Sequence, residues 1–124
     1  MPKTSKASAS QSVDNAEYEG HFEHLPGGLT VGFETYKKDE DLTDAFSGLP
    51  GNRCPCPHWG YVMKGRVVFT YADRTESYGA GDAYYAPPGH TPVLFAGTEI
   101  VEFSPTNDLK RTMEVMAKNQ QAGG

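Results

Sequence analysis

A cluster of side chains that can bind metals lies in the middle of the chain, in the sequence CPCPHW. It contains Cys54, Cys56 and His58, and the chain has only these two cysteines. Thiolate sulfur and imidazole nitrogen suit zinc, iron or copper better than magnesium or calcium. The same residue types would also serve a thiol pair that responds to oxidation. The cluster therefore predicts either a transition-metal site or a redox-responsive segment.

Two prolines limit how this cluster can act. Each cysteine precedes a proline, and a residue before proline adopts extended or polyproline geometry. With about three residues per turn in that geometry, side chains two apart point in different directions. We therefore expect one cysteine to reach a site, and Cys56, which is nearer the following strand, is favoured over Cys54. A disulfide between them would close a small, strained ring, so free thiols are expected.

The composition favours one small all-β domain. The chain has 124 residues, with 14 glycines and 9 prolines that mark many turns. Its 7 tyrosines, 6 phenylalanines and single tryptophan must supply much of the buried area. We predict a disordered tail over residues 1–12 and a single domain over residues 13–124.

The charge and hydropathy patterns narrow the partners. A net charge of −5 without a concentrated basic stripe disfavours nucleic acid and anionic membranes, so a small-molecule ligand is expected. No apolar run approaches the length of a membrane span, and residues 1–12 lack the apolar segment of a secretory signal. The sequence therefore predicts a cytoplasmic protein.

Short apolar segments separated by turn residues follow one another through the chain. We interpret 13–24 as an extended lead-in, 27–36 as a strand with Leu29, Val31 and Phe33 on its buried face, and 37–52 as a loop. Further strands are predicted at 58–64, 67–71, 76–78, 83–86, 93–95 and 99–103. A C-terminal helix of about ten residues follows, with an apolar stripe facing inward, formed by Leu109, Met113 and Met116. This order indicates a sandwich or barrel.

Two motifs in this region resemble the cupin superfamily. The stretch GDAYYAPPG, from Gly81 to Gly89, matches the second cupin motif, and YVMKG, from Tyr61 to Gly65, resembles the hairpin that ends the first. The resemblance covers about the C-terminal two thirds of the chain and extends to small single-domain bacterial cupins. It implies a jelly-roll barrel, the double-stranded β-helix, with the short C-terminal α-helix added. It also implies a homodimer.

The first metal-binding motif of that family is altered here. In the family, a His-x-His pair is followed by a glutamate. Six residues then lie between that glutamate and the hairpin glycine. Counting back from Gly65, the glutamate position is His58 and the second histidine position is Cys54. The first histidine position is Asn52. If the variable gap between the second histidine and the glutamate is one residue longer, the second histidine position becomes Arg53 and the first becomes Gly51.

The second motif is altered as well. The family's histidine position falls on Pro92, whereas His90 lies two residues earlier. Side chains two apart on a strand share a face, so His90 can still point into the barrel at a different depth. The family's four-ligand site is therefore absent as written, and a rearranged site is expected.

The rearranged site is predicted to hold a divalent transition metal, zinc or iron in the first place. Its ligands would be Cys56, His58 and His90, with Glu102 of the last strand as a fourth. Aromatic side chains are expected to line the adjoining pocket, namely Tyr61, Tyr71, Tyr85 and Phe95. Each of these residues could instead have a purely structural role. Cys56 would then be a buried thiol, His58 an interior histidine, His90 a turn histidine and Glu102 a surface carboxylate.

Three functions follow from these observations. The first is a metal-dependent isomerase, lyase or dioxygenase that acts on a small molecule in the barrel mouth. The second is a non-catalytic cupin that binds a small ligand and needs no metal. The third is a redox-responsive module that works through its two cysteines. The fold alone does not choose between them, because cupins share one fold across unrelated activities.

Overall fold

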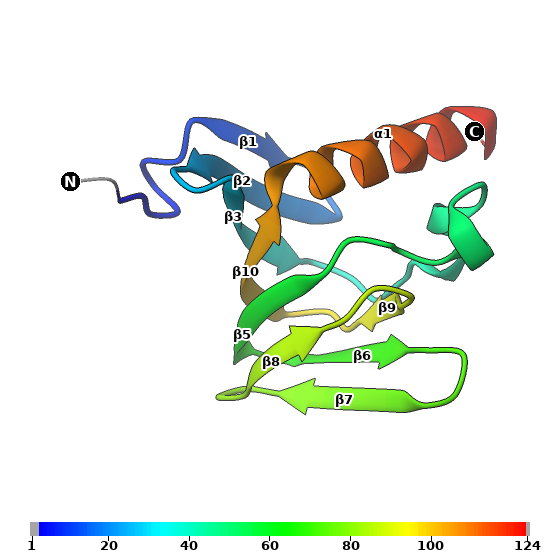
Figure 1. Cartoon of the computed structure of the whole chain (residues 1–124). Helices are drawn as coiled ribbons and strands as arrows, with labels where there is room; N and C mark the ends of the chain where they lie inside the picture. Colours follow the sequence, from blue (N-terminus) through cyan, green and yellow to red (C-terminus); the bar gives the residue numbers. More distant parts are fainter. Residues whose placement is uncertain (1–2, 124) are drawn as a thin grey trace.

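Two antiparallel sheets and a C-terminal helix form the structure, a computed structural model that describes residues 3–123 and the side chains up to residue 119. Figure 1 shows the helix over the β1–β3 part of the molecule, away from β6 and β7. The six-stranded sheet has the order β1 (Gln11–Asp14), β2 (Tyr18–Leu25), β3 (Leu29–Tyr36), β10 (Thr98–Pro105), β5 (His58–Lys64) and β8 (Ala83–Ala86). The four-stranded sheet has the order β4 (Glu40–Asp41), β9 (Thr91–Leu94), β6 (Arg66–Thr70) and β7 (Thr75–Gly79).

Two short 3₁₀ helices and one α-helix complete the chain. The 3₁₀ helices are η1 (Thr43–Phe46) and η2 (Pro50–Asn52), and the α-helix is α1 (Thr106–Gly123). Within the described residues, no helix is both long enough and apolar enough to cross a membrane. The jelly-roll architecture predicted from the sequence is confirmed, whereas α1 has 18 residues, more than the ten expected.

The N-terminal region contributes more strand than its polar sequence indicates. Residues 11–14 form β1, which pairs with β2, so residues 11 and 12 belong to the sheet rather than to a tail. The predicted lead-in over 13–24 contains most of β2, which pairs with β3 along its whole length. β1 is the edge strand of this sheet, whereas β2 lies between β1 and β3 and is held there by pairing on both sides rather than by an apolar alternation of its own.

The inner face of the six-stranded sheet carries polar groups among aromatic rings. One row of paired residues crosses five neighbouring strands. In the order β2, β3, β10, β5 and β8, its members are Phe22, Gly32, Glu102, Gly60 and Tyr84. In the neighbouring rows Glu34 pairs with Ile100, and Ser104 with Thr30. The inner residues of β3 are therefore the even-numbered ones, and Leu29, Val31 and Phe33 lie on the outer face. The sequence predicted the strand correctly, and Val31 is buried as predicted at 2% exposed, but it lies on the outer face of the sheet.

Glycines on this face make room for the rings beside them. A Cβ at Gly60 would overlap the ring of Tyr84 on the neighbouring strand, and a Cβ at Gly32 would come within 2.7 Å of the Phe22 ring. The rings therefore lie flat across the strands. This packing brings the hydroxyl of Tyr84 over the sheet toward Glu102.

Apolar side chains from both sheets fill the space between them. The buried core consists of Tyr36, Val62, Val67, Phe69, Tyr71, Tyr84, Ala86, Leu94 and Ile100. A second cluster joins Phe46, Cys54 and Cys56 to Leu109 and Met116 of the helix. Part of the predicted helical stripe thus packs inward, while Met113 stays 41% exposed.

Candidate metal centre

Three buried side chains converge on one point in the interior. Cys54, His58 and His90 each offer a ligand atom, and these atoms all lie within 4.8 Å of one another. Cys54 Sγ is 3.7 Å from His58 Nε2, and the ring centres of the two histidines are 5.0 Å apart. Tetrahedral zinc with bonds of about 2.0–2.3 Å places its ligands roughly 3.3–3.8 Å apart. The group therefore needs only small movements to enclose a metal ion.

Each member of the group reaches this point from a different segment. His58 begins β5, His90 comes directly before β9, and Cys54 pairs with His90 through an isolated β-bridge. Backbone hydrogen bonds join Cys54 N to His90 O and Gly89 N to Cys54 O, both at 2.8 Å. The loop before β5 is therefore held against the turn before β9, and this pairing brings Cys54 to the two histidines.

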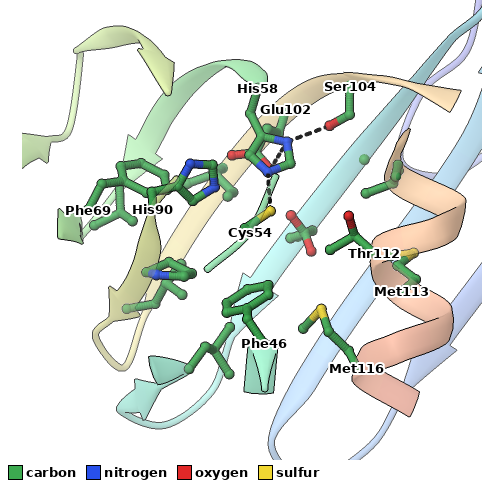
Figure 2. A pocket seen from close by; sticks show the side chains of 18 of the residues that line it. Phe46, Cys54, His58, Phe69, His90, Glu102, Ser104, Thr112, Met113 and Met116 are labelled. Atoms are coloured by element: carbon green, nitrogen blue, oxygen red, sulfur yellow. Dashed lines mark hydrogen bonds and ion pairs between the residues drawn. The ribbon is translucent and has the colours of Figure 1, made fainter. Parts of the chain in front are cut away.

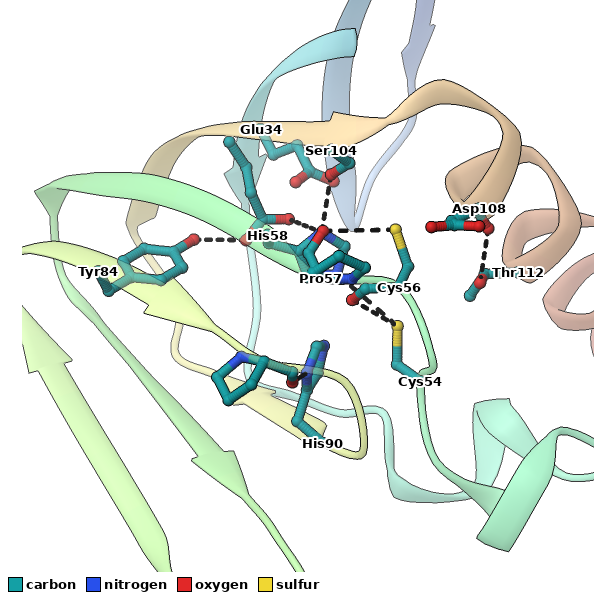
Figure 3. Close-up of polar contacts among 12 residues, drawn as sticks. Glu34, Cys54, Cys56, Pro57, His58, Tyr84, His90, Ser104, Asp108 and Thr112 are labelled. Atoms are coloured by element: carbon teal, nitrogen blue, oxygen red, sulfur yellow. Dashed lines mark hydrogen bonds and ion pairs between the residues drawn. The ribbon is translucent and has the colours of Figure 1, made fainter. Parts of the chain in front are cut away.

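Hydrogen bonds fix the ring of His58. Its Nδ1 lies 2.7 Å from Ser104 Oγ and 3.4 Å from Glu102 Oε1, as Figure 3 shows for Ser104. A proton on Nδ1 satisfies the carboxylate and leaves the lone pair on Nε2, which faces Cys54. Histidines that bind metals commonly donate their second ring nitrogen in this way.

The ring of His90 is fixed in the same manner. Its Nδ1 donates to the carbonyl oxygen of Pro87 at 2.8 Å. Because a carbonyl only accepts, Nδ1 carries the proton and Nε2 keeps a lone pair. Rings of Phe69 and Tyr71 pack edge-on against the imidazole. Both histidines thus have an anchored Nδ1 and an Nε2 that is available for a ligand.

Burial sets the protonation of all three groups. It lowers the pKa of His58 and that of His90 to about 4, so both rings are neutral at neutral pH. It raises the pKa of the Cys54 thiol to about 12. A divalent cation favours the thiolate, so binding at this group would release a proton.

A cavity of about 100 Å³ adjoins the three ligand atoms. All three side chains line it, and Figure 2 shows them with Phe46, Met113 and Met116, which also contribute to its wall. Most of the remaining lining is apolar, formed by Phe22, Leu42, Val67, Phe69, Leu94, Ile100 and Leu109. The cavity therefore offers a small molecule an apolar wall and a polar end.

Two carboxyl groups, Glu34 and Glu102, line the same cavity. Tyr84 donates to Glu102 at 2.5 Å, and Glu34 accepts from Tyr18 at 2.5 Å and from Tyr36 at 3.4 Å. Burial raises the pKa of both carboxyl groups to about 7, and the charge of Glu102 adds to the effect on Glu34. No lysine or arginine is among the described residues that line this cavity.

The predicted ligands meet this geometry in part. His58 and His90 belong to the group that could hold a metal, and Cys54 takes the place expected for Cys56. Cys56 Sγ instead donates to the carbonyl oxygen of Pro57 at 3.5 Å. Glu102 points inward, but it contacts His58 Nδ1, on the side of the ring away from Cys54. Glu102 therefore lies outside the group of three side chains that could hold a metal.

The four aromatic residues predicted for the pocket lie elsewhere. Tyr61 and Tyr85 are 44% and 48% exposed, because they alternate with the inward residues of β5 and β8. Tyr71 is buried behind His90, and Arg74 lies over its ring. Phe95 packs under Arg66. None of the four is among the residues that line the cavity.

Sequence reasoning missed Cys54, Glu34 and Tyr84, although a signal for Cys54 was present. Cys54 occupies the second histidine position when the cupin motif is counted back from Gly65, so the motif indicated the right cysteine. Gly60 stands opposite Tyr84, but this pairing is known only once the register of the strands is known. Nothing in the local sequence indicated that Glu34 points inward.

Solved structures share this fold. A protein of unknown function from Rhizobium leguminosarum bv. viciae 3841 has a TM-score of 0.60 and 20% identity, covering 84% of this chain and 94% of that one. The polyketide cyclase RemF from Streptomyces resistomycificus has a TM-score of 0.56 and 14% identity, covering 86% and 80%. An RmlC-like cupin from Shewanella frigidimarina NCIMB 400 has a TM-score of 0.50 and 16% identity, covering 77% and 83%.

Comparison of the sequence with models of protein families finds no match, and comparison with curated proteins finds none either. At such low identities the solved structures show the fold and leave the activity open. The chain is therefore a small cupin-fold protein. Its interior brings a cysteine and two histidines together beside a cavity.

Proposed function

We propose that the protein binds a divalent transition metal, zinc in the first place, through Cys54, His58 and His90. In this proposal it acts as a metal-dependent isomerase or lyase on a small molecule. The convergence of the three ligand atoms beside the cavity carries the proposal. That RemF, an enzyme, has the same fold also supports it.

The ligand types favour zinc over the other candidates. One sulfur and two imidazole nitrogens are a common zinc set, and three protein ligands leave a fourth position for water or substrate. A zinc ion there would polarise an oxygen of the substrate or lower the pKa of a bound water. Because zinc has no redox chemistry, isomerase or lyase activity fits this set better than dioxygenase activity.

In this proposal, other residues of the chain hold the two histidine ligands in place, exchange protons with the substrate and keep water away from it. Ser104 and Glu102 keep the ring of His58 in place through Nδ1, and Pro87 does so for His90. The carboxyl group of Glu34 can accept or donate a proton at a pH near its raised pKa of about 7. The apolar wall would exclude water from the substrate.

The redox function is disfavoured by the state of the thiols. Burial raises the pKa of Cys54 and that of Cys56 to about 12. A thiolate is the reactive form, so thiols with such pKa values react slowly with oxidants.

The two cysteines provide a matched test. We expect protein purified without a histidine tag to contain about one zinc per chain, measured by elemental analysis. Cys54→Ser and His58→Ala should lower the zinc affinity by at least about a hundredfold, whereas Cys56→Ser should leave it close to wild type. A competition titration with a chromogenic chelator measures all four proteins.

Two results would contradict the proposal. One is wild-type protein that holds no transition metal and binds no added zinc at about micromolar concentration; this would favour the non-catalytic ligand-binding alternative. The other is an equal loss of affinity in both cysteine variants, which would place the metal elsewhere in the cluster.

A further inference from the structure

Glu34 lies where an outer cleft meets the inner cavity. The cleft, about 710 Å³ in volume, runs between β1–β3, the η1 region and α1. It shares five lining residues with the inner cavity, namely Glu34, Tyr36, Leu42, Met113 and Met116. The two spaces therefore adjoin at Glu34, and a molecule that moved from the cleft to Cys54, His58 and His90 would pass its side chain.

The charges along this path have one sign. The cleft is lined by Glu17, Glu40 and Asp44 in addition to Glu34, and no lysine or arginine is among its described lining residues. Lys38 pairs with Glu17 at 2.8 Å and also lies near enough to Glu40 for that carboxylate to raise the pKa of the lysine. The cation of Lys38 therefore offsets part of the negative charge at the rim, while Asp44 and Glu34 lie further from it. Further in, Glu34 and Glu102 line the cavity without a cation. An entering anion would meet repulsion from these carboxylates at both stages, and the only cation it could reach is the bound metal ion, whose charge the Cys54 thiolate offsets in part.

The hydrogen bonds of Glu34 leave it acceptor capacity. Tyr18 and Tyr36 both donate to Oε1, and none of the described residues donates a hydrogen bond to Oε2. A carboxylate oxygen accepts more than one hydrogen bond. Oε2 can therefore accept from an N–H or O–H of a molecule in the cavity.

The size and walls of the cavity limit what fits. Its volume of about 100 Å³ is smaller than an engineered cavity of about 150 Å³ that holds benzene. Aromatic, aliphatic and methionine side chains form most of the wall. The occupant must therefore be a molecule of a few heavy atoms with an apolar body.

We propose that the metal centre takes small uncharged or cationic molecules and rejects anions of the same size, with Glu34 as the residue that sets this specificity. Such a molecule carries one atom that binds the metal and one N–H or O–H that reaches Glu34. The inference rests on the metal site proposed above and adds the class of substrate to it.

Cobalt(II) in place of zinc gives a direct measurement, because its visible absorption changes when a ligand enters the fourth position. Imidazole serves as the uncharged probe and acetate as the anionic one, both at about pH 8. We expect wild-type protein to bind imidazole at least about a hundredfold more tightly than acetate. Glu34→Gln should narrow that ratio at least about tenfold by strengthening acetate binding.

Glu99→Gln is the matched control. Glu99 lies on β10, as Glu102 does, but on the outer face, where it pairs with Lys64 at 3.3 Å. This variant removes the same charge from outside the cavity, so its ratio should equal that of wild type. Circular dichroism and cobalt stoichiometry show whether each variant is folded and loaded.

The outcomes separate this inference from the proposed function. Cobalt-loaded wild type that binds acetate as tightly as imidazole overturns the specificity and leaves the metal site standing; this result needs no variant. An unchanged ratio in a folded, loaded Glu34→Gln protein overturns the role of Glu34. If wild type binds no cobalt, the metal site fails and the specificity fails with it.

Discussion

Glu34 is a half-buried carboxyl group whose hydrogen-bond partners are uncharged. Tyr18 and Tyr36 donate to it, but burial and the nearby charge of Glu102 still raise its pKa from 4.5 to about 7. A carboxyl group with a raised native pKa stabilises the fold fully at a pH below its unfolded pKa. That contribution is lost as the pH rises through the native pKa. The interior therefore carries a group that favours folding in mild acid.

Glu34→Gln should remove this pH dependence, because an amide does not ionise. In metal-free wild type, Glu34 ionises first in the unfolded chain, so its contribution to the free energy of unfolding falls between about pH 4.5 and pH 7. Between these two pH values, we expect the free energy of unfolding of the variant to rise by roughly 2 kcal/mol relative to that of wild type. Denaturant unfolding at the two ends of the window measures it. A difference that stays constant would contradict the raised pKa.

The identity of single site residues was only partly predictable from the sequence. His58 stands at the glutamate position of the first cupin motif, and His90 lies two residues before the histidine position of the second, so strand alternation places it on the same face as that position. Glu34 could not be inferred, because the apolar alternation of Leu29 and Val31 predicts the opposite face for it. That alternation reports an apolar face, and here the apolar face is the outer one.

At the scale of elements, the pairing of β5 with β8 decides which tyrosine enters the interior. Gly60 stands opposite Tyr84, and Trp59 stands opposite Tyr85. The ring of Tyr84 covers the glycine and its hydroxyl reaches Glu102, while Tyr85 stacks on Trp59 outside. Alternation along β8 predicts that one tyrosine faces out, but only the register across the strands shows which.

Gly60→Ala is expected to destabilise the protein by about 1–3 kcal/mol, because the new methyl group would overlap the Tyr84 ring. The displaced ring would also lose its hydrogen bond to Glu102. Gly79→Ala is the control: Gly79 ends β7, and an added Cβ there meets nothing within 4 Å. Urea unfolding compares the two variants. Equal stability of both would show that Tyr84 does not depend on the space above Gly60.

Most elements could be predicted, because their sequences carry turn residues at both ends and apolar alternation between them. The strands β5 and β8 have the predicted bounds. β2 escaped prediction because its partners on the sheet, rather than its own polar sequence, hold it in place. The contact between Cys54 and His90 escaped for the same reason: a bridge between two loops has no local pattern.

At the scale of the whole molecule, the outer face of the six-stranded sheet is apolar where β10, β5 and β8 run side by side. Phe103, Trp59 and Tyr85 stand in one row across these strands, with Tyr61 on the same face. They are 37%, 45%, 48% and 44% exposed, in that order. Exposed aromatic rings that lie together are typical of protein interfaces. The inner face of this sheet thus carries the polar groups that line the cavity, and its outer face carries the exposed aromatic rings.

The homodimer expected from the cupin resemblance is proposed to form through this face. Wild-type protein should sediment as a dimer at about 100 µM, and Trp59→Glu should shift it to monomer, because a charge in an apolar interface costs several kcal/mol. Val13→Glu is the control: Val13 is 51% exposed on β1, at the opposite edge of the same sheet. It should leave the dimer intact. A wild-type monomer at that concentration would contradict the dimer, and a dimer that survives Trp59→Glu would place the interface on another surface.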